Sequence, residues 1–138
     1  MEKLAFMIAT LLVSFMANAQ VSGTRITVRI PNLVNDEGKV MVSLHQKDTF
    51  MKGPGIQNLE STIENGKATL TFDNVMQGEY AILAMHDVNE NKQMDFDVNG
   101  MPLEGYGMSG NEMTMGPPQF ESAKFTVGTE PMEMAIRF

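Results

Sequence analysis

The chain has 138 residues, no cysteine and a formal net charge of −7 at pH 7. Without cysteine it has no disulfide and no thiolate metal site, so packing alone must stabilise the fold. The acidic balance argues against nucleic acid as a partner, because Lys and Arg drive binding to phosphates. The same balance disfavours anionic membrane surfaces.

The first 19 residues have the pattern of an export signal. An apolar run from Leu4 to Phe15 follows Lys3 and ends before Ala17 and Ala19, small residues that fit a signal peptidase. The run is too short to span a bilayer comfortably, although an uncleaved anchor is the alternative. We expect a cleaved signal over 1–19, one domain over 20–138, no stable membrane insertion, and a periplasmic or secreted location.

Apolar residues in the rest of the chain recur with a period of two, which is typical of half-buried strands. The segments with this pattern are 25–30, 39–45, 61–64, 67–72, 78–86, 120–127 and 132–138. Asn65-Gly66 lies between two of them and favours a tight hairpin turn. About seven short strands predict an all-β, antiparallel Greek-key sandwich of the immunoglobulin-like or transthyretin-like type.

Two residues on these strands carry further predictions. Tyr80 follows Gly78 at a strand start, which is the pattern of a tyrosine corner, whose hydroxyl bonds to backbone just upstream. A tyrosine that merely packs in the core is the alternative. His45 lies on the face opposite the apolar residues of its strand, so we expect it at the surface.

The segment His86–Gln119 has no clear strand or helix, and loops of that length are usually functional or disordered. It contains six acidic residues and one lysine, which leaves a formal −5 of the chain's −7. Carboxylates at this density repel one another, and a bound cation is the simplest way to order them.

The start of this acidic loop has the spacing of a calcium site. Oxygen ligands two residues apart can wrap one hard cation, as in an EF-hand. The residues expected to do so are Asp87, Asn89, Asn91, Gln93 and Asp95. Because Lys92 and Val98 replace the EF-hand Gly and bidentate Glu, Asp97 or Glu104 would close the coordination shell. The alternative is a solvated acidic turn whose Asx residues bond to their own backbone.

The second half of the loop is rich in Gly and Pro, which give it a special backbone shape. His86, Tyr106 and Ser109 are the polar residues expected to face a ligand or partner. A purely structural role is the alternative for each.

Three motifs in this part of the chain resemble a known bacterial family. They are His86-Asp87-x-Asn89-x-Asn91-x-x-x-Asp95, Gly100-x-Pro102-x-Glu104-x-Tyr106-Gly107-x-Ser109 and Pro118-x-Phe120-x-x-Ala123-x-Phe125. Together they are similar to the exported family of domain of unknown function 2141, from about Arg25 to Phe138. The resemblance implies an exported β-sandwich without pointing to one activity. Members usually have Gly where this chain has Lys92.

Two other function classes stay open. A small hydrolase or lyase would use His86 with Glu104, and a Ser-His-Asp set can be written with Asp87 and Ser109. However, the chain has no Gly-x-Ser-x-Gly elbow, and adjacent side chains on a strand point to opposite faces.

A copper(I) carrier would use the thioethers of Met113 and Met115 with a third soft ligand. Loop packing onto the sheet is the alternative for these methionines. The interpretation that we favour is an exported, monomeric, non-catalytic binding or structural module for a protein or glycan partner. Calcium would stabilise its 87–97 loop.

Overall fold

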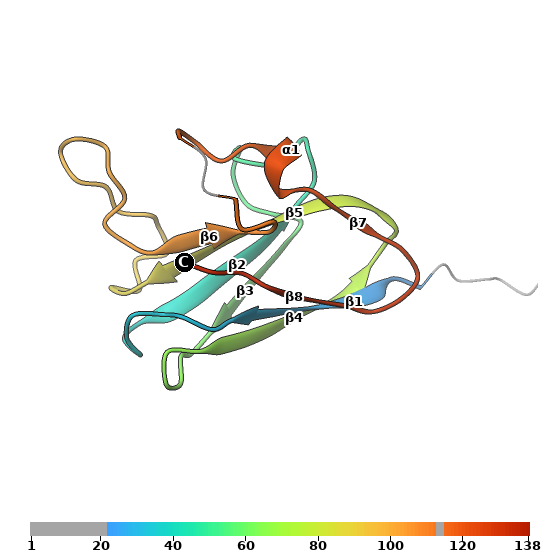
Figure 1. Cartoon of the computed structure of the whole chain (residues 1–138), viewed down its shortest axis with the longest axis horizontal. Helices are drawn as coiled ribbons and strands as arrows, with labels where there is room; N and C mark the ends of the chain where they lie inside the picture. Colours follow the sequence, from blue (N-terminus) through green and yellow to red (C-terminus); the bar gives the residue numbers. More distant parts are fainter. Residues whose placement is uncertain (1–21, 113–114) are drawn as a thin grey trace, which may run out of the picture.

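The computed structural model describes residues 22–112 and 115–138, so the predicted signal and Met113 lie outside the described residues. Two facing sheets form a sandwich (Figure 1). The strands are β1 (Thr24–Ile30), β2 (Lys39–His45), β3 (Gln57–Ser61), β4 (Ala68–Val75), β5 (Gly78–Asp87), β6 (Tyr106–Met108), β7 (Phe125–Val127) and β8 (Met132–Ala135), and α1 (Phe120–Ala123) is a short helix. The predicted all-β sandwich is confirmed.

The smaller sheet has the order β4-β1-β8, and the larger has the order β3-β2-β5-β6, with β7 also paired to β5. The sheets are mostly antiparallel, as expected, whereas β1 and β8 run parallel. The immunoglobulin-like Greek-key assignment stays a prediction. No helix in residues 22–112 or 115–138 is long and apolar enough to cross a membrane.

The core lies between the two sheets and follows the period-two pattern. On β1 and β2 the inward side chains, among them Val28, Ile30, Val42 and Leu44, are fully buried. Burial of this apolar surface is the main force that holds the sheets together. A second, smaller apolar cluster includes Phe50, Ala81, Met108, Phe120 and Ala123. On β5, Ala81 lies between residues whose side chains point into the core between the two sheets. This second cluster therefore covers the opposite face of the larger sheet.

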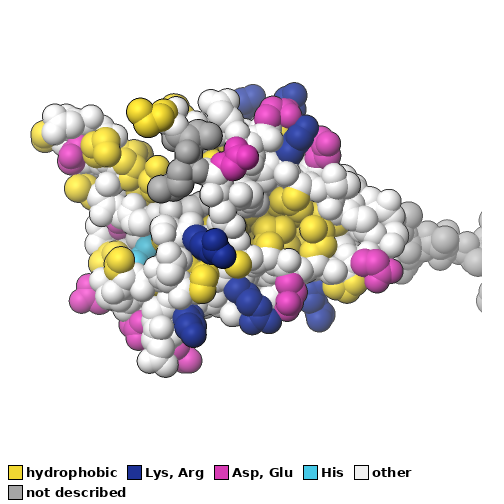
Figure 2. Space-filling view, in the orientation of Figure 1, with side chains coloured by type: hydrophobic (Ala, Val, Ile, Leu, Met, Phe, Trp, Pro, Cys, Tyr) yellow, Lys and Arg dark blue, Asp and Glu magenta, His cyan; other side chains and the backbone are white. Residues whose placement is uncertain are grey.

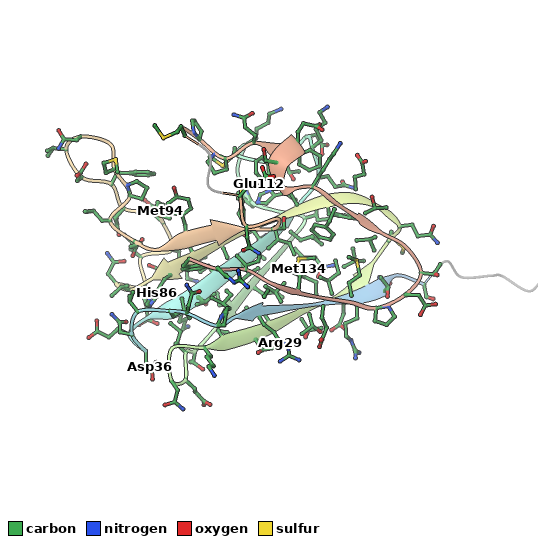
Figure 3. All side chains as sticks on the ribbon, in the orientation of Figure 1. Arg29, Asp36, His86, Met94, Glu112 and Met134 are labelled. Atoms are coloured by element: carbon green, nitrogen blue, oxygen red, sulfur yellow. The ribbon has the colours of Figure 1, made fainter. Side chains whose placement is uncertain are left out.

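The predicted hairpin at Asn65-Gly66 is wrong as a strand pairing, although the turn itself forms. Both residues have positive φ, and a single bridge joins Glu64 and Lys67. The preceding strand lies at Gln57–Ser61 instead of 61–64 and pairs with β2, whereas β4 pairs with β1. The turn therefore passes the chain from one sheet to the other. The Asp36 carboxylate fixes it by accepting the Asn65 and Gly66 N–H groups at 3.0 and 2.7 Å (Figure 3).

Two elements near the C-terminus also differ from the prediction. The segment 120–127 was expected to be one strand, but it begins as α1 and only Phe125–Val127 is extended. Phe120 and Ala123 are three residues apart, so a helical turn directs both onto the sheet, where they are buried. The acidic loop, expected to lack strands, contains β6, which pairs antiparallel with β5.

The two single-residue predictions have opposite outcomes. The Tyr80 hydroxyl donates to the Met76 carbonyl at 2.8 Å, so the tyrosine corner forms. The surface position predicted for His45 is wrong, because the loop after β2 folds back over it. The His45 imidazole packs edge-on against Phe50 at 5.8 Å between ring centres and lies 3.2 Å from the Thr49 hydroxyl. Burial lowers the pKa of His45, and a hydrogen bond with Thr49 acts in the opposite direction.

Candidate functional site in the loop between β5 and β6

The loop between β5 and β6 projects beyond the end of the larger sheet (Figure 1). We call residues 95–103 the tip. Four apolar side chains there are exposed to solvent: Phe96 by 58%, Val98 by 101%, Met101 by 63% and Leu103 by 66%. Hydrophobic side chains gather on the same projection in Figure 2. An exposed group of large apolar residues on one protruding element is typical of an interaction surface.

Asp87 begins the loop at the end of β5, where its side chain is buried. One carboxylate oxygen accepts the Asn91 N–H at 3.2 Å, and the other accepts the Lys92 N–H at 2.8 Å. These bonds close the first turn of the loop. Lys92 and Glu90 have positive φ, a conformation that such a tight turn requires. Asp87 therefore satisfies backbone donors that the turn would otherwise leave unpaired.

Three further predicted ligands converge next to this turn. The Asn89 amide donates to the Asp95 carboxylate at 2.9 Å, and the Asn91 amide donates to both oxygens of that carboxylate at 2.8 and 2.9 Å. The two amide oxygens accept backbone N–H groups, Asn89 from Asn91 and Asn91 from Gln93. The structure therefore brings these three side chains together, with the hydrogen bonds of Asx turns, the arrangement of the alternative interpretation.

Glu104 and Asp97 are each committed elsewhere in the loop. Glu104 is buried, and its two carboxylate oxygens accept the Val88 N–H at 3.1 Å and the Asp95 N–H at 3.3 Å. It thereby joins the start of the loop to the tip. Asp97 accepts the Asn99 and Met101 N–H groups through one oxygen at 2.8 and 2.9 Å. Neither carboxylate closes a coordination shell in this arrangement.

Main-chain hydrogen bonds complete the tip. The Asp97 N–H donates to the Met101 carbonyl at 2.9 Å, and the Leu103 N–H donates to the Asp95 carbonyl at 2.8 Å. A bridge between Phe96 and Pro102 lies between these two bonds. The tip is therefore a closed, hairpin-like structure: Asp97 accepts N–H groups of the tip backbone, Asp95 accepts the Asn89 and Asn91 amides, and the apolar side chains are exposed to solvent.

Ion pairs attach the loop to the sheet beneath it. The Lys92 ammonium lies 3.4 Å from Glu60 on β3, and the Lys39 ammonium on β2 lies 3.4 Å from Glu60 and 3.8 Å from Glu90. The hydrogen bond from Lys39 and the charge of Lys92 hold the pKa of Glu60 below its ordinary value. These groups are largely exposed, so each pair contributes little to stability. Lys92 thus lies between the loop and β3.

Of the three polar residues expected to face a ligand, His86 and Ser109 are hydrogen-bonded to backbone groups. His86 is buried, and its Nε2–H donates to the Glu37 carbonyl at 2.6 Å, which holds the turn before β2 (Figure 3). The buried Ser109 hydroxyl accepts the Ile82 N–H at 2.9 Å and donates to the Ala123 carbonyl. Tyr106 is exposed beside the base of the loop. No hydrogen bond connects His86 with Glu104 or Ser109 in the described part of the chain.

Within residues 22–112 and 115–138, no group of three or more His, Asp or Glu side chains is placed to hold a metal ion. The set that comes closest has two carboxylates and two amides, Asp87, Asn89, Asn91 and Asp95, and Gln93 adjoins it through its N–H. Of the two methionines considered for copper, Met115 is fully exposed and Met113 lies outside the described residues.

The sequence interpretation missed the apolar residues of the tip. Phe96 and Val98 are two residues apart, as are Met101 and Leu103, and each pair alone resembles the core-facing pattern of a strand. Their position in the sequence is what could have indicated exposure, because they lie inside an acidic, Gly- and Asn-rich segment with no partner strand of its own.

Comparisons with known proteins agree with the motifs of this loop. The family model described as "Uncharacterized protein conserved in bacteria (DUF2141)" matches residues 28–135, a range that holds the core strands and the whole acidic loop. The search of curated proteins and the search of solved structures returned no match. The chain belongs to the DUF2141 family of bacterial proteins.

Proposed function

We propose that the protein is an exported, non-catalytic binding module that contacts a protein or glycan partner through the tip of its β5–β6 loop. The observation that supports this most strongly is the arrangement of the tip, where Asp95 and Asp97 turn inward and Phe96, Val98 and Met101 turn outward. Leaving large apolar side chains in water is unfavourable, by about 1.5–3 kcal/mol per side chain relative to burial. A partner that covers them recovers this free energy.

The hydrogen bonds of the loop add a second reason. A loop that is already ordered loses less conformational entropy when it binds, and this increases affinity. Asp87 and Glu104 supply that order from the buried base of the loop, and Asp97 supplies it within the tip. The acidic residues therefore serve as scaffolding for an apolar recognition surface.

The engagement of the polar residues supports a non-catalytic role. A nucleophile or general base needs an unoccupied lone pair or proton directed at a substrate. Ser109 uses both its donor and its acceptor on backbone groups, and Glu104 uses both oxygens in the same way. His86 donates to a carbonyl on the core side of β5. A hydrolase that used these side chains would have to break these hydrogen bonds before catalysis.

The same loop offers one place for calcium, and we propose it as a secondary feature of the module. The supporting observation is that Asn89 and Asn91 already meet at the Asp95 carboxylate, next to Asp87. Rotating the two amides would direct their oxygens at an ion held by the two carboxylates, in the manner of hard-cation sites. In EDTA the N–H donors take the place of the ion.

Thermal unfolding of the chain 20–138 tests the calcium proposal. At ten times Kd, ligand linkage predicts a stabilisation of about 1.4 kcal/mol in calcium relative to EDTA. Asp95→Asn should remove this increment. An equal melting temperature in EDTA, calcium and magnesium would contradict the site and leave the solvated Asx turns alone.

Site-specific photo-crosslinking in the native bacterium tests the binding module. A benzophenone side chain replaces Val98 in the tip or Val34, a matched control that is 87% exposed on the turn between β1 and β2. We expect discrete adducts from position 98 and none from position 34. Identical results from both positions would overturn the assignment of the tip. Export is checked in the same cells, where a mature mass beginning at Gln20 is expected outside the cytoplasm.

A further inference from the structure

The chain contains two Asn-Gly sequences, Asn65-Gly66 and Asn99-Gly100. In such a pair the backbone nitrogen of the glycine can attack the side-chain amide of the asparagine, because glycine has no side chain to block the approach. Both asparagines are exposed, and both glycines have positive φ, +72° and +80°. Local sequence and exposure therefore do not distinguish the two pairs, but their surroundings do.

The attack requires the backbone of the pair to move. Closing a ring between the glycine nitrogen and the asparagine side chain needs rotation about the bond between the asparagine Cα and its carbonyl carbon. The glycine N–H turns with that rotation, so the hydrogen bond it donates must break and the turn must open. The free energy of such a local opening depends on the contacts that the turn makes with the rest of the fold.

The turn at Asn65-Gly66 is clamped by the connection between β1 and β2. The Asp36 carboxylate accepts the Asn65 and Gly66 N–H groups at 3.0 and 2.7 Å. The Gly66 carbonyl accepts the Leu33 N–H at 2.8 Å, and an added Cβ at Gly66 would lie 2.8 Å from the Leu33 oxygen. Opening this turn therefore means separating it from a second segment of the chain.

The turn at Asn99-Gly100 has partners only within the tip. The Gly100 N–H donates to the Asp97 carbonyl at 3.0 Å, and the Asn99 N–H donates to the Asp97 carboxylate at 2.8 Å. An added Cβ at Gly100 would meet nothing within 4 Å, since the tip projects beyond the sheet (Figure 1). This turn can open without disturbing the sandwich, and water has free access to it.

We propose that Asn99 is a site of spontaneous deamidation and that the fold protects Asn65 from the same reaction. The Gly100 nitrogen forms a bond to Cγ of Asn99 and loses its proton, and the side-chain amide leaves as ammonia. The product is a five-membered succinimide. One water molecule then opens the ring at either carbonyl, which gives aspartate or isoaspartate at position 99. The net reaction consumes one water and releases one ammonia, without an enzyme, a metal or an oxidant.

Both products change the tip. Each adds a carboxylate next to Val98, in a segment 95–104 that already has three acids and no base. Isoaspartate also adds one carbon to the backbone between positions 99 and 100, which shifts Gly100 and Met101 away from their bonds to Asp97. The modification does not depend on the identity of any partner, so it stands or falls separately from the proposed function.

Peptide mapping by mass spectrometry of the folded chain 20–138, held at mildly alkaline pH, measures conversion at each position. Trypsin places Asn65 in peptide 53–67 and Asn99 in peptide 93–124, so one sample reports both, and fragment ions assign the position. We expect Asn99 to convert at least about five-fold faster than Asn65, because the tip opens more easily than the clamped turn. A smaller ratio, or faster conversion at Asn65, would overturn the proposal.

Three controls assign the difference to the fold. In concentrated urea the two asparagines should convert at similar rates. Asp36→Ala removes the clamp and should accelerate conversion at Asn65 in the folded chain while Asn99 keeps its rate. Asn99→Gln should strongly slow conversion at position 99, because the longer side chain must form a six-membered ring. If the five-fold ratio persists in urea, or if Asp36→Ala leaves Asn65 unchanged, the protection does not come from the fold and the inference fails.

Discussion

Replacing Ser109 with alanine should destabilise the fold strongly, although the change removes a single oxygen atom. The Ser109 hydroxyl joins β5 to α1, because it accepts from Ile82 and donates to Ala123. Both of these residues are fully buried. The substitution leaves one backbone N–H and one carbonyl without a partner or access to water.

The magnitude follows from these two groups. A buried donor or acceptor left unsatisfied costs about 1–3 kcal/mol, so Ser109→Ala should lower the free energy of unfolding by about 2–4 kcal/mol. For a domain of this size that corresponds to a fall of about 10 °C in Tm. The denaturant m-value should stay unchanged, because the folded surface is the same.

Urea unfolding of the wild type, Ser109→Ala and Ser43→Ala measures this difference. Ser43 is the control, since its hydroxyl donates to the exposed Asn58 side chain at 2.8 Å and its loss should change stability by less than about 0.5 kcal/mol. A Ser109→Ala chain as stable as the wild type would refute the reasoning. Ser109 would then not be a structural tie, and its hydroxyl would be available for a ligand.

Three further predictions concern other buried polar groups. Asp87→Ala should lower stability by about 2–4 kcal/mol even in EDTA, because its bonds to Asn91 and Lys92 need no ion; destabilisation confined to calcium buffers would contradict this. His45 has a lowered pKa, so the unfolded chain takes up the proton first and stability should fall as the pH drops below about 6.5. The slope should be smaller in His45→Gln than in the wild type between pH 7 and 5.5, and equal slopes would exclude a contribution from His45. Tyr80→Phe should cost about 1 kcal/mol by losing the bond to Met76, and an unchanged urea midpoint would show that packing alone matters there.

The sequence predicts the parts of the fold that depend on local pattern. Val28, Val42 and Leu70 are buried as their period-two spacing requires. The sequence does not predict which strands pair with each other. Asn65-Gly66 forms its turn, but the turn leads the chain from one sheet into the other. His45 and Phe120 were misplaced for a related reason. Only in the folded chain does the loop that carries Phe50 cover His45, and does α1 place Phe120 against Phe50.

For the site as well, the sequence predicts the local contacts but not their chemical role. Side chains two residues apart in an Asx-rich turn must come together, and Asn89, Asn91 and Asp95 do. The spacing cannot specify whether their oxygens face a cation or backbone N–H groups, because both arrangements use the same turn. Asp97 accepts the Asn99 and Met101 N–H groups, while the Val98 and Met101 side chains are exposed. The apolar residues alone do not distinguish this exposed loop from a buried strand.

The claim on which the proposals depend is that the tip is folded before it meets an ion or a partner. Amide hydrogen exchange of the chain 20–138 in EDTA, at a concentration where it is monomeric, measures this directly. The hydrogen bonds predict slowed exchange at the amides of Asp97, Gly100, Met101 and Leu103. Val98 should exchange faster and serves as the internal reference. Exchange of all five amides at the rate of an unstructured peptide would contradict a preordered recognition loop.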